Sequence, residues 1–217
     1  MRTALPARLQ KPYSGAAHDV LRSIGHSNCV LPINIRPLDS ALKVAGSVWT
    51  VSGRMDRTQS RRSTLLGWTT LLSKTPAGHV IVCSPNNHEV GLMGDLSAQA
   101  LKHKGVLAYV VDGGCRDCDF ILEQKFAVFH IFFTPIDIVA PWILDHCEQA
   151  VTKGKVAIST GHYLLCDWDG VVVTPKELVQ TVVTQTEAVA MAENQVRAAP
   201  ILDGMDPVEA YLKYGKF

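Results

Sequence analysis

The segment 106–117 constrains the fold most, because a strand without polar positions ends there in glycines and an ion pair. Residues 106–111 read VLAYVV, so both faces of the strand carry apolar side chains. Such strands are typical of parallel sheets that are covered on both sides. Gly113 and Gly114 follow, and then Arg116 and Asp117. Open α/β folds bind ligands beyond the carboxyl ends of their strands, so this segment predicts a ligand site.

The stretch just upstream predicts a helix whose first turn lies beside that site. Residues 94–105 read GDLSAQALKHKG, with an acid at the start, lysines near the end and a glycine that stops the helix. This order agrees with helix capping and with the helix dipole. Free N–H groups at a helix start bind carboxylates. Arg116 adds a bidentate donor, and Asp117 with Asp95 offers oxygen ligands suited to Mg²⁺ or Mn²⁺.

A purely structural interpretation of the same residues stays open. Arg116 and Asp117 are neighbours after a strand, where such pairs often form a surface ion pair. Asp95 fits equally well as a helix N-cap.

Strands and helices alternate along the rest of the chain without a linker, which predicts one α/β domain over residues 1–217. The pattern predicts helices over 16–25, 65–74, 117–125 and 176–199, and β-structure over 35–53, 79–83, 106–114 and parts of 126–144. The stretch 126–144 holds His130, Asp137 and two prolines, so it is too broken to span a bilayer.

Charge and cysteine usage exclude some classes of protein. Lys and Arg number 21 against 20 Asp and Glu, a balance that gives no support to a general nucleic-acid or membrane-surface role. A mean hydropathy of +0.11 fits a large core or an oligomer, and we favour the oligomer. The first residues lack the apolar run of a secretory signal, so a cytoplasmic protein with reduced thiols is expected. Cys115 and Cys118 form a lone C-x-x-C, which favours neither zinc nor redox chemistry.

Three motifs together resemble the RraA-like family. They are GDLSAQALKHKG (94–105), VVDGGCRD (110–117) and CDWDGVVVTPKEL (166–178), and the resemblance covers roughly residues 16–217. That family includes divalent-metal aldolases acting on 4-hydroxy-4-methyl-2-oxoglutarate and 4-carboxy-4-hydroxy-2-oxoadipate. It also contains proteins described as regulators of ribonuclease E.

The resemblance implies a single compact α/β/β swivelling-type domain that assembles as a homotrimer or homohexamer with sites between subunits. Residues 1–15 would form an N-terminal extension, and the helix and tail over 176–217 would contact a neighbouring subunit.

The resemblance also assigns roles to individual residues. Asp117 matches a metal ligand and Arg116 the arginine that contacts the keto and carboxylate oxygens of the substrate. The backbone amides of Leu96 and Ser97 match those that hold the carboxylate, and Asp95 matches an aspartate that orders water on the metal. Glu193 matches an acidic residue that reaches a neighbour's metal; a solvated face of the helix 176–199 is the alternative for it.

The implied activity is that of a metal-dependent lyase, a class II pyruvate aldolase or an oxaloacetate decarboxylase. It would cleave or decarboxylate a small 2-oxo dicarboxylic or tricarboxylic acid through a pyruvate-type enolate, with Mg²⁺ or Mn²⁺ as cofactor. Two alternatives remain. One is an enzyme that uses the same metal and enolate chemistry on a different small acid, and the other is a non-catalytic regulator that binds a ribonuclease.

The chain departs from the family pattern in one stretch that bears on the substrate. An arginine and a glycine often found after the strand near FAVF are absent, and the chain reads FHIFFTPID over 129–137. Substrate contacts are expected there, so the identity of the substrate stays open.

Overall fold

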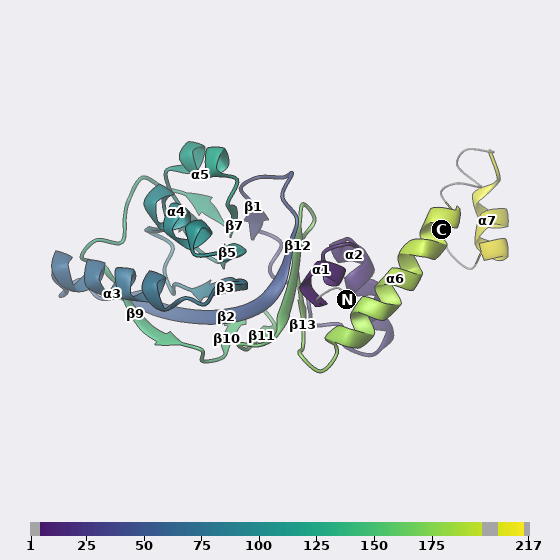
Figure 1. Ribbon diagram of the computed structural model, residues 1–217, viewed down its shortest axis with the longest axis horizontal. Coiled ribbons are helices and arrows are strands. Elements are labelled where there is room, and N and C mark those ends of the chain that lie inside the picture. The colour runs from purple at the N-terminus through teal and green to yellow at the C-terminus, as the bar shows by residue number, and fades with distance from the viewer. Residues whose placement is uncertain (1–4, 197–203, 215–217) are drawn as a thin grey trace.

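The computed structural model describes residues 5–196 and 204–214, with side chains over 5–191 and 204–214. Its main sheet has eight strands, in the order β1-β7-β5-β3-β2-β12-β13, with β9 paired to β2 (Figure 1). The central strands β7, β5, β3 and β2 run parallel, and β1, β9, β12 and β13 are antiparallel to their neighbours. Their bounds are β1 Arg36–Pro37, β2 Val44–Met55, β3 His79–Ser84, β5 Ala108–Val111, β7 Ala127–His130, β9 Trp142–Cys147, β12 Tyr163–Asp167 and β13 Gly170–Thr174.

Two small sheets accompany the main one. Strands β4 (Gly91–Met93), β6 (Gly114–Cys115) and β8 (Phe132–Phe133) form a parallel three-stranded sheet, and β10 (Val151–Lys153) pairs antiparallel with β11 (Val156–Ile158). The mixed α/β class predicted from the sequence is therefore confirmed.

Strand β5 is buried on both faces, which explains its unbroken apolar sequence. In β5, Tyr109 and Val111 join one core cluster, whereas Ala108 and Val110 join a second cluster on the opposite face. Side chains alternate between the faces of a strand, so a strand with apolar residues at every position must be covered twice.

Helices cover separate parts of the sheet. Helices α3 (Arg61–Lys74), α4 (Asp95–His103) and α5 (Cys118–Gln124) share one core cluster with residues of β4 and β6. Helices α1 (Leu5–Leu9), α2 (Ser14–Ser23) and α6 (Val179–Val196) gather at the β12–β13 end, and α6 leads away from the body towards α7 (Pro207–Tyr214). Among the described helices, none is both long and apolar enough to cross a bilayer.

The sequence predicted most of these elements. The helix expected over 65–74 starts four residues earlier, because Ser60 caps it by accepting a hydrogen bond from the amide of Ser63. The helix expected over 16–25 is Ser14–Ser23, and the one expected over 176–199 begins at Val179. All six cysteines are free thiols, including the Cys115 and Cys118 pair.

Candidate functional site

Three parallel strands deliver the site residues to one place. The backbone after β4 enters helix α4, the backbone after β6 becomes Arg116 and Asp117, and the backbone after β8 becomes the loop 134–139. Two hydrogen bonds tie these segments together: the amide of Arg116 donates to Met93 O (2.9 Å), and the amide of Gly91 donates to Ile136 O (2.8 Å). The ligand site that we expected beyond the carboxyl ends of parallel strands therefore lies at the edge of the three-stranded sheet β4-β6-β8.

A pocket of about 230 Å³ lies at this edge. Its lining includes five of the six residues that the sequence singled out, namely Asp95, Leu96, Ser97, Arg116 and Asp117. Glu193 belongs to α6, and its side chain lies outside the described residues. The volume suits a small metabolite, since drug-sized ligands occupy pockets from about 300 Å³ upward.

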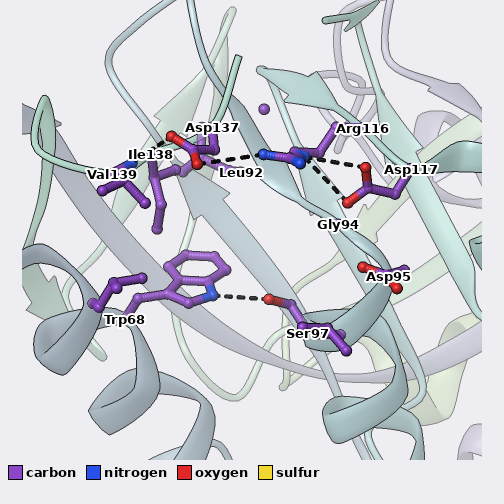
Figure 2. Close-up of a pocket in the computed structure, with 13 residues that line it drawn as sticks. Trp68, Leu92, Gly94, Asp95, Ser97, Arg116, Asp117, Asp137, Ile138 and Val139 are labelled. Atoms are coloured by element: carbon purple, nitrogen blue, oxygen red, sulfur yellow. Dashed lines mark hydrogen bonds and ion pairs between the residues drawn. The ribbon is translucent and has the colours of Figure 1, made fainter. Parts of the chain in front are cut away.

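Arg116 lies between two carboxylates (Figure 2). Its Nε donates to both carboxylate oxygens of Asp117, at 3.1 and 3.2 Å, and one terminal nitrogen lies 3.5 Å from Asp137 Oδ2. The side chains of Arg116 and Asp117 are 31% and 29% exposed, so the pair faces the pocket and is only partly screened by water. The ion pair of Arg116 and Asp117 that the sequence suggested is therefore present, and it lines a pocket.

The backbone conformation of Asp117 places its carboxylate next to Arg116. Its φ of 53° and ψ of 38° are left-handed, a conformation that aspartate tolerates better than most residues. Asp117 precedes α5 without capping it through its side chain, which is paired with Arg116 instead. A Cβ on Gly94 would lie 2.7 Å from Asp117 Oδ2, so a larger residue there would displace the carboxylate from this position.

The start of α4 supplies free amides. Its N-cap is Gly94, with no side-chain cap, and the first backbone bond back to that residue comes from the amide of Ala98 at 3.0 Å. The amides of Leu96 and Ser97 therefore lie in the unpaired first turn. Asp95 is the first residue inside the helix, so the alternative that it acts as the N-cap is wrong.

Among the lining residues that the sequence did not single out are Trp68, Ile138 and Val139. Asp137 also lines the pocket, at the end of the stretch 129–137 where substrate contacts were expected. Trp68 is 6% exposed, and its Nε1 donates to Ser97 Oγ at 2.9 Å. Asp137 accepts a hydrogen bond from the amide of Val139 at 3.0 Å. The available signals were the carboxylate of Asp137 inside the largely apolar stretch 126–144 and the departure of 129–137 from the family pattern.

The charge of the pocket suits a divalent cation. Three carboxylates, Asp95, Asp117 and Asp137, accompany a single guanidinium, so an anionic ligand alone would meet net repulsion. Among the described residues, no group of three or more His, Cys, Asp or Glu is arranged to hold a metal. Mg²⁺ is nevertheless commonly held by one or two carboxylates together with substrate oxygens and water, which these residues fit.

Comparisons with known proteins agree with the motifs. An uncharacterised protein of Methanocaldococcus jannaschii is 31% identical over 125 residues, which are 58% of this chain and 59% of that protein. A protein of Halalkalibacterium halodurans, provisionally named a 4-hydroxy-4-methyl-2-oxoglutarate aldolase, is 25% identical over 84% of this chain and 83% of its own length.

Solved structures and a family model extend the likeness. RraAS2 of Streptomyces coelicolor, described as an unusual member of the RNase ES inhibitor RraA protein family, has a TM-score of 0.79 at 25% identity, covering 89% of this chain and 96% of that one. The model of the RraA-like family, described as Aldolase/RraA, matches residues 15–173. The chain therefore belongs to the RraA-like family.

Proposed function

We propose that the protein is a divalent-metal lyase that releases a pyruvate-type enolate from a small 2-oxo acid. The observation that carries the proposal is the pocket itself, where Arg116 lies between Asp117 and Asp137 beside the unpaired first turn of α4. A cation, free backbone amides and carboxylates in one small cavity are the groups that bind a 2-oxo acid and stabilise its enolate.

Each group has a distinct task in this proposal. The amides of Leu96 and Ser97 hold the substrate carboxylate at the positive end of α4. Arg116 donates to the keto oxygen and stabilises the charge that develops there as the carbon–carbon bond breaks. Asp95, which makes no hydrogen bond through its side chain within the described residues, positions a water that takes the proton of the substrate hydroxyl.

Among the residues whose side chains are described, Asp117 would hold a divalent cation. Glu193 of a neighbouring copy is proposed as a further ligand. When bound, the cation supplies Lewis-acid polarisation of the 2-oxo acid. No lysine lines the pocket among the described residues, which fits a reaction without a Schiff base.

The test measures pyruvate release from 4-hydroxy-2-oxo acids and from oxaloacetate in the presence of Mg²⁺ or Mn²⁺. We expect EDTA to abolish release, Mg²⁺ to restore it, and borohydride to leave it unaffected. Arg116→Ala should lower kcat/KM on the order of 100-fold or more, the usual effect of losing such a donor. Asp117→Asn should do the same while keeping the left-handed backbone, which asparagine also tolerates.

Arg57→Ala is the matched control, because Arg57 is exposed, pairs with Glu89 and lies outside the pocket lining. Activity that survives EDTA, or that survives both pocket substitutions, would show the mechanism to be wrong. Failure of every 2-oxo acid to react or to bind would favour the regulator alternative.

A further inference from the structure

The pocket has two chemically different sides. Figure 2 shows Arg116, Asp117 and Asp95 on one side and Trp68, Ile138 and Val139 on the other. Leu65 of α3 and the buried Leu92 also line the cavity. Asp137 lies beside Ile138 and Val139 on this second side. A substrate whose carboxylate meets Arg116 and the start of α4 would place its other end near these apolar side chains and this carboxylate.

The indole of Trp68 makes this apolar side rigid. Its only polar group, Nε1–H, is occupied by Ser97 Oγ at 2.9 Å. Its ring meets Trp142 edge to face, with centroids 5.8 Å apart. The indole therefore has no donor left for a second acid group on the substrate.

Within one chain, no free cation among the described lining residues of this pocket is available for such a second acid group, and Arg61 and Arg62 line a separate hollow that shares only Leu65 with it. Arg116 is the one Lys or Arg among the described lining residues, and it is already paired with Asp117 and Asp137. Asp137 adds a negative charge next to Ile138 and Val139, and its other oxygen accepts the amide of Val139. A distal carboxylate on the substrate would thus be desolvated against apolar groups and repelled by Asp137.

Building on the proposed function, we infer that the substrate is a 4-hydroxy-2-oxo monocarboxylic acid with an apolar aryl or branched alkyl group on C4. This departs from the dicarboxylic or tricarboxylic acid that the family resemblance implies. In the retro-aldol step the C4 hydroxyl loses its proton to water, its oxygen forms the carbonyl of the departing aldehyde, and the C3–C4 bond breaks. The electron pair moves to C3 and the keto oxygen as the enolate, and a proton then adds to C3 to give pyruvate.

The inference is tested by comparing the kcat/KM values with which the protein cleaves two matched substrates. The compounds are 4-hydroxy-2-oxo-4-phenylbutanoate and 4-hydroxy-2-oxoglutarate, which differ in carrying a phenyl or a carboxylate on C4. We expect kcat/KM to favour the phenyl compound by about 100-fold, the scale on which a pocket rejects a group it leaves unpaired. Equal rates, or a preference for the dicarboxylate, would overturn the inference while leaving the proposed lyase intact.

Binding tests the same inference without turnover. The unreactive pair 2-oxo-4-phenylbutanoate and 2-oxoglutarate is titrated calorimetrically into the protein with Mg²⁺ present. We expect the phenyl compound to bind at least about tenfold more tightly. If no acid is cleaved but this preference holds, the lyase proposal fails and the specificity stands; if 2-oxoglutarate binds as well or better, or if the phenyl compound does not bind, the specificity fails.

A charge added to the apolar side should reverse the preference. Leu65 is partly exposed and lines the pocket, so Leu65→Arg offers a cation to a distal carboxylate. We expect the phenyl-to-carboxylate ratio of kcat/KM to fall on the order of tenfold or more. Leu66→Arg places the same charge on the next residue, which is 62% exposed and outside the lining, and should leave the ratio unchanged. An unchanged ratio in a folded Leu65→Arg protein contradicts the inference, and the binding pair tests it in the unmodified protein.

Discussion

Lys153 is a lysine whose side chain is fully buried, next to the strand that leads into the site. Its Nζ donates to Ser84 Oγ at 2.9 Å and pairs with the carboxylate of Asp112. Burial lowers the pKa of Lys153, and the nearby Asp112 counteracts part of that effect. Asp112 begins the loop to Arg116, so this pair fixes the first residue of the segment that carries the proposed site.

Asp112→Asn should destabilise the protein by about 3 kcal/mol near neutral pH, because it leaves a buried ammonium without its counter-ion. The pKa of Lys153 then falls further, so the unfolded chain binds more protons than the folded one at every pH between that lower value and the ordinary 10.5. Stability must therefore rise with pH in this window, and the deficit against the unmodified protein should shrink from pH 7 to pH 10.

Urea unfolding at several pH values measures this effect. Lys153→Met in the Asp112→Asn background is the control, because it removes the buried charge and should remove the added pH dependence. A deficit that stays constant from pH 7 to pH 10 in Asp112→Asn would mean that Lys153 is not the group responsible.

At the scale of elements, the pairing of β2 with β9 depends on Gly53. It pairs with β3 up to Ser52 and with β9 from Val51 onward, and the register with β9 shifts between Ser52 and Gly53. A Cβ on Gly53 would overlap the indole of Trp142 and the carbonyl of Ile143. Because Trp142 packs against Trp68, this bend also supports the apolar side of the pocket.

Gly53→Ala should lower the free energy of unfolding by about 2–3 kcal/mol, since overpacking a buried strand forces neighbours to move. Gly67→Ala, in the middle of α3 with no atom within 4 Å of its added Cβ, should raise that free energy by about 0.5–1 kcal/mol. Urea unfolding of the two variants measures both changes in the free energy of unfolding. A Gly53→Ala protein as stable as the original would mean that the bend at Gly53 accepts a side chain.

The pattern of apolar residues was enough to predict most of the elements but not the way they meet, and it did not show α1, α7, β10 or β11. The strand 106–111 and the helix after Gly94 were both predicted, because double burial and helix ends leave local signals in the sequence. The role of Trp68 in the pocket depends on which face of α3 meets β9 and α4, and no local pattern shows that. Asp137 was visible as a charge in an apolar stretch, but its approach to Arg116 depends on the neighbouring ends of β6 and β8.

For the whole molecule, the C-terminal helices carry apolar side chains that the body does not cover. Within α7, Val208 is 64%, Tyr211 57% and Leu212 77% exposed, and Met191 on α6 is 66% exposed. Figure 1 shows α6 and α7 reaching away from the sheet. Apolar groups gathered in this way often mark a protein interface. We propose that they pack on a neighbouring copy, which would also bring Glu193 towards that copy's pocket.

Substitution on α7 should break this assembly and, with it, activity. Tyr211→Glu combined with Leu212→Glu places two charges in the proposed contact, and we expect the mass measured by light scattering to fall from a trimer or hexamer towards one chain. Because Glu193 is proposed to act on the neighbour's metal, pyruvate release should fall together with the mass. Lys213→Glu changes the charge of a neighbouring exposed residue of the same helix and should alter neither as strongly. A monomeric parent protein, or a doubly substituted protein of unchanged mass, would contradict the proposed interface.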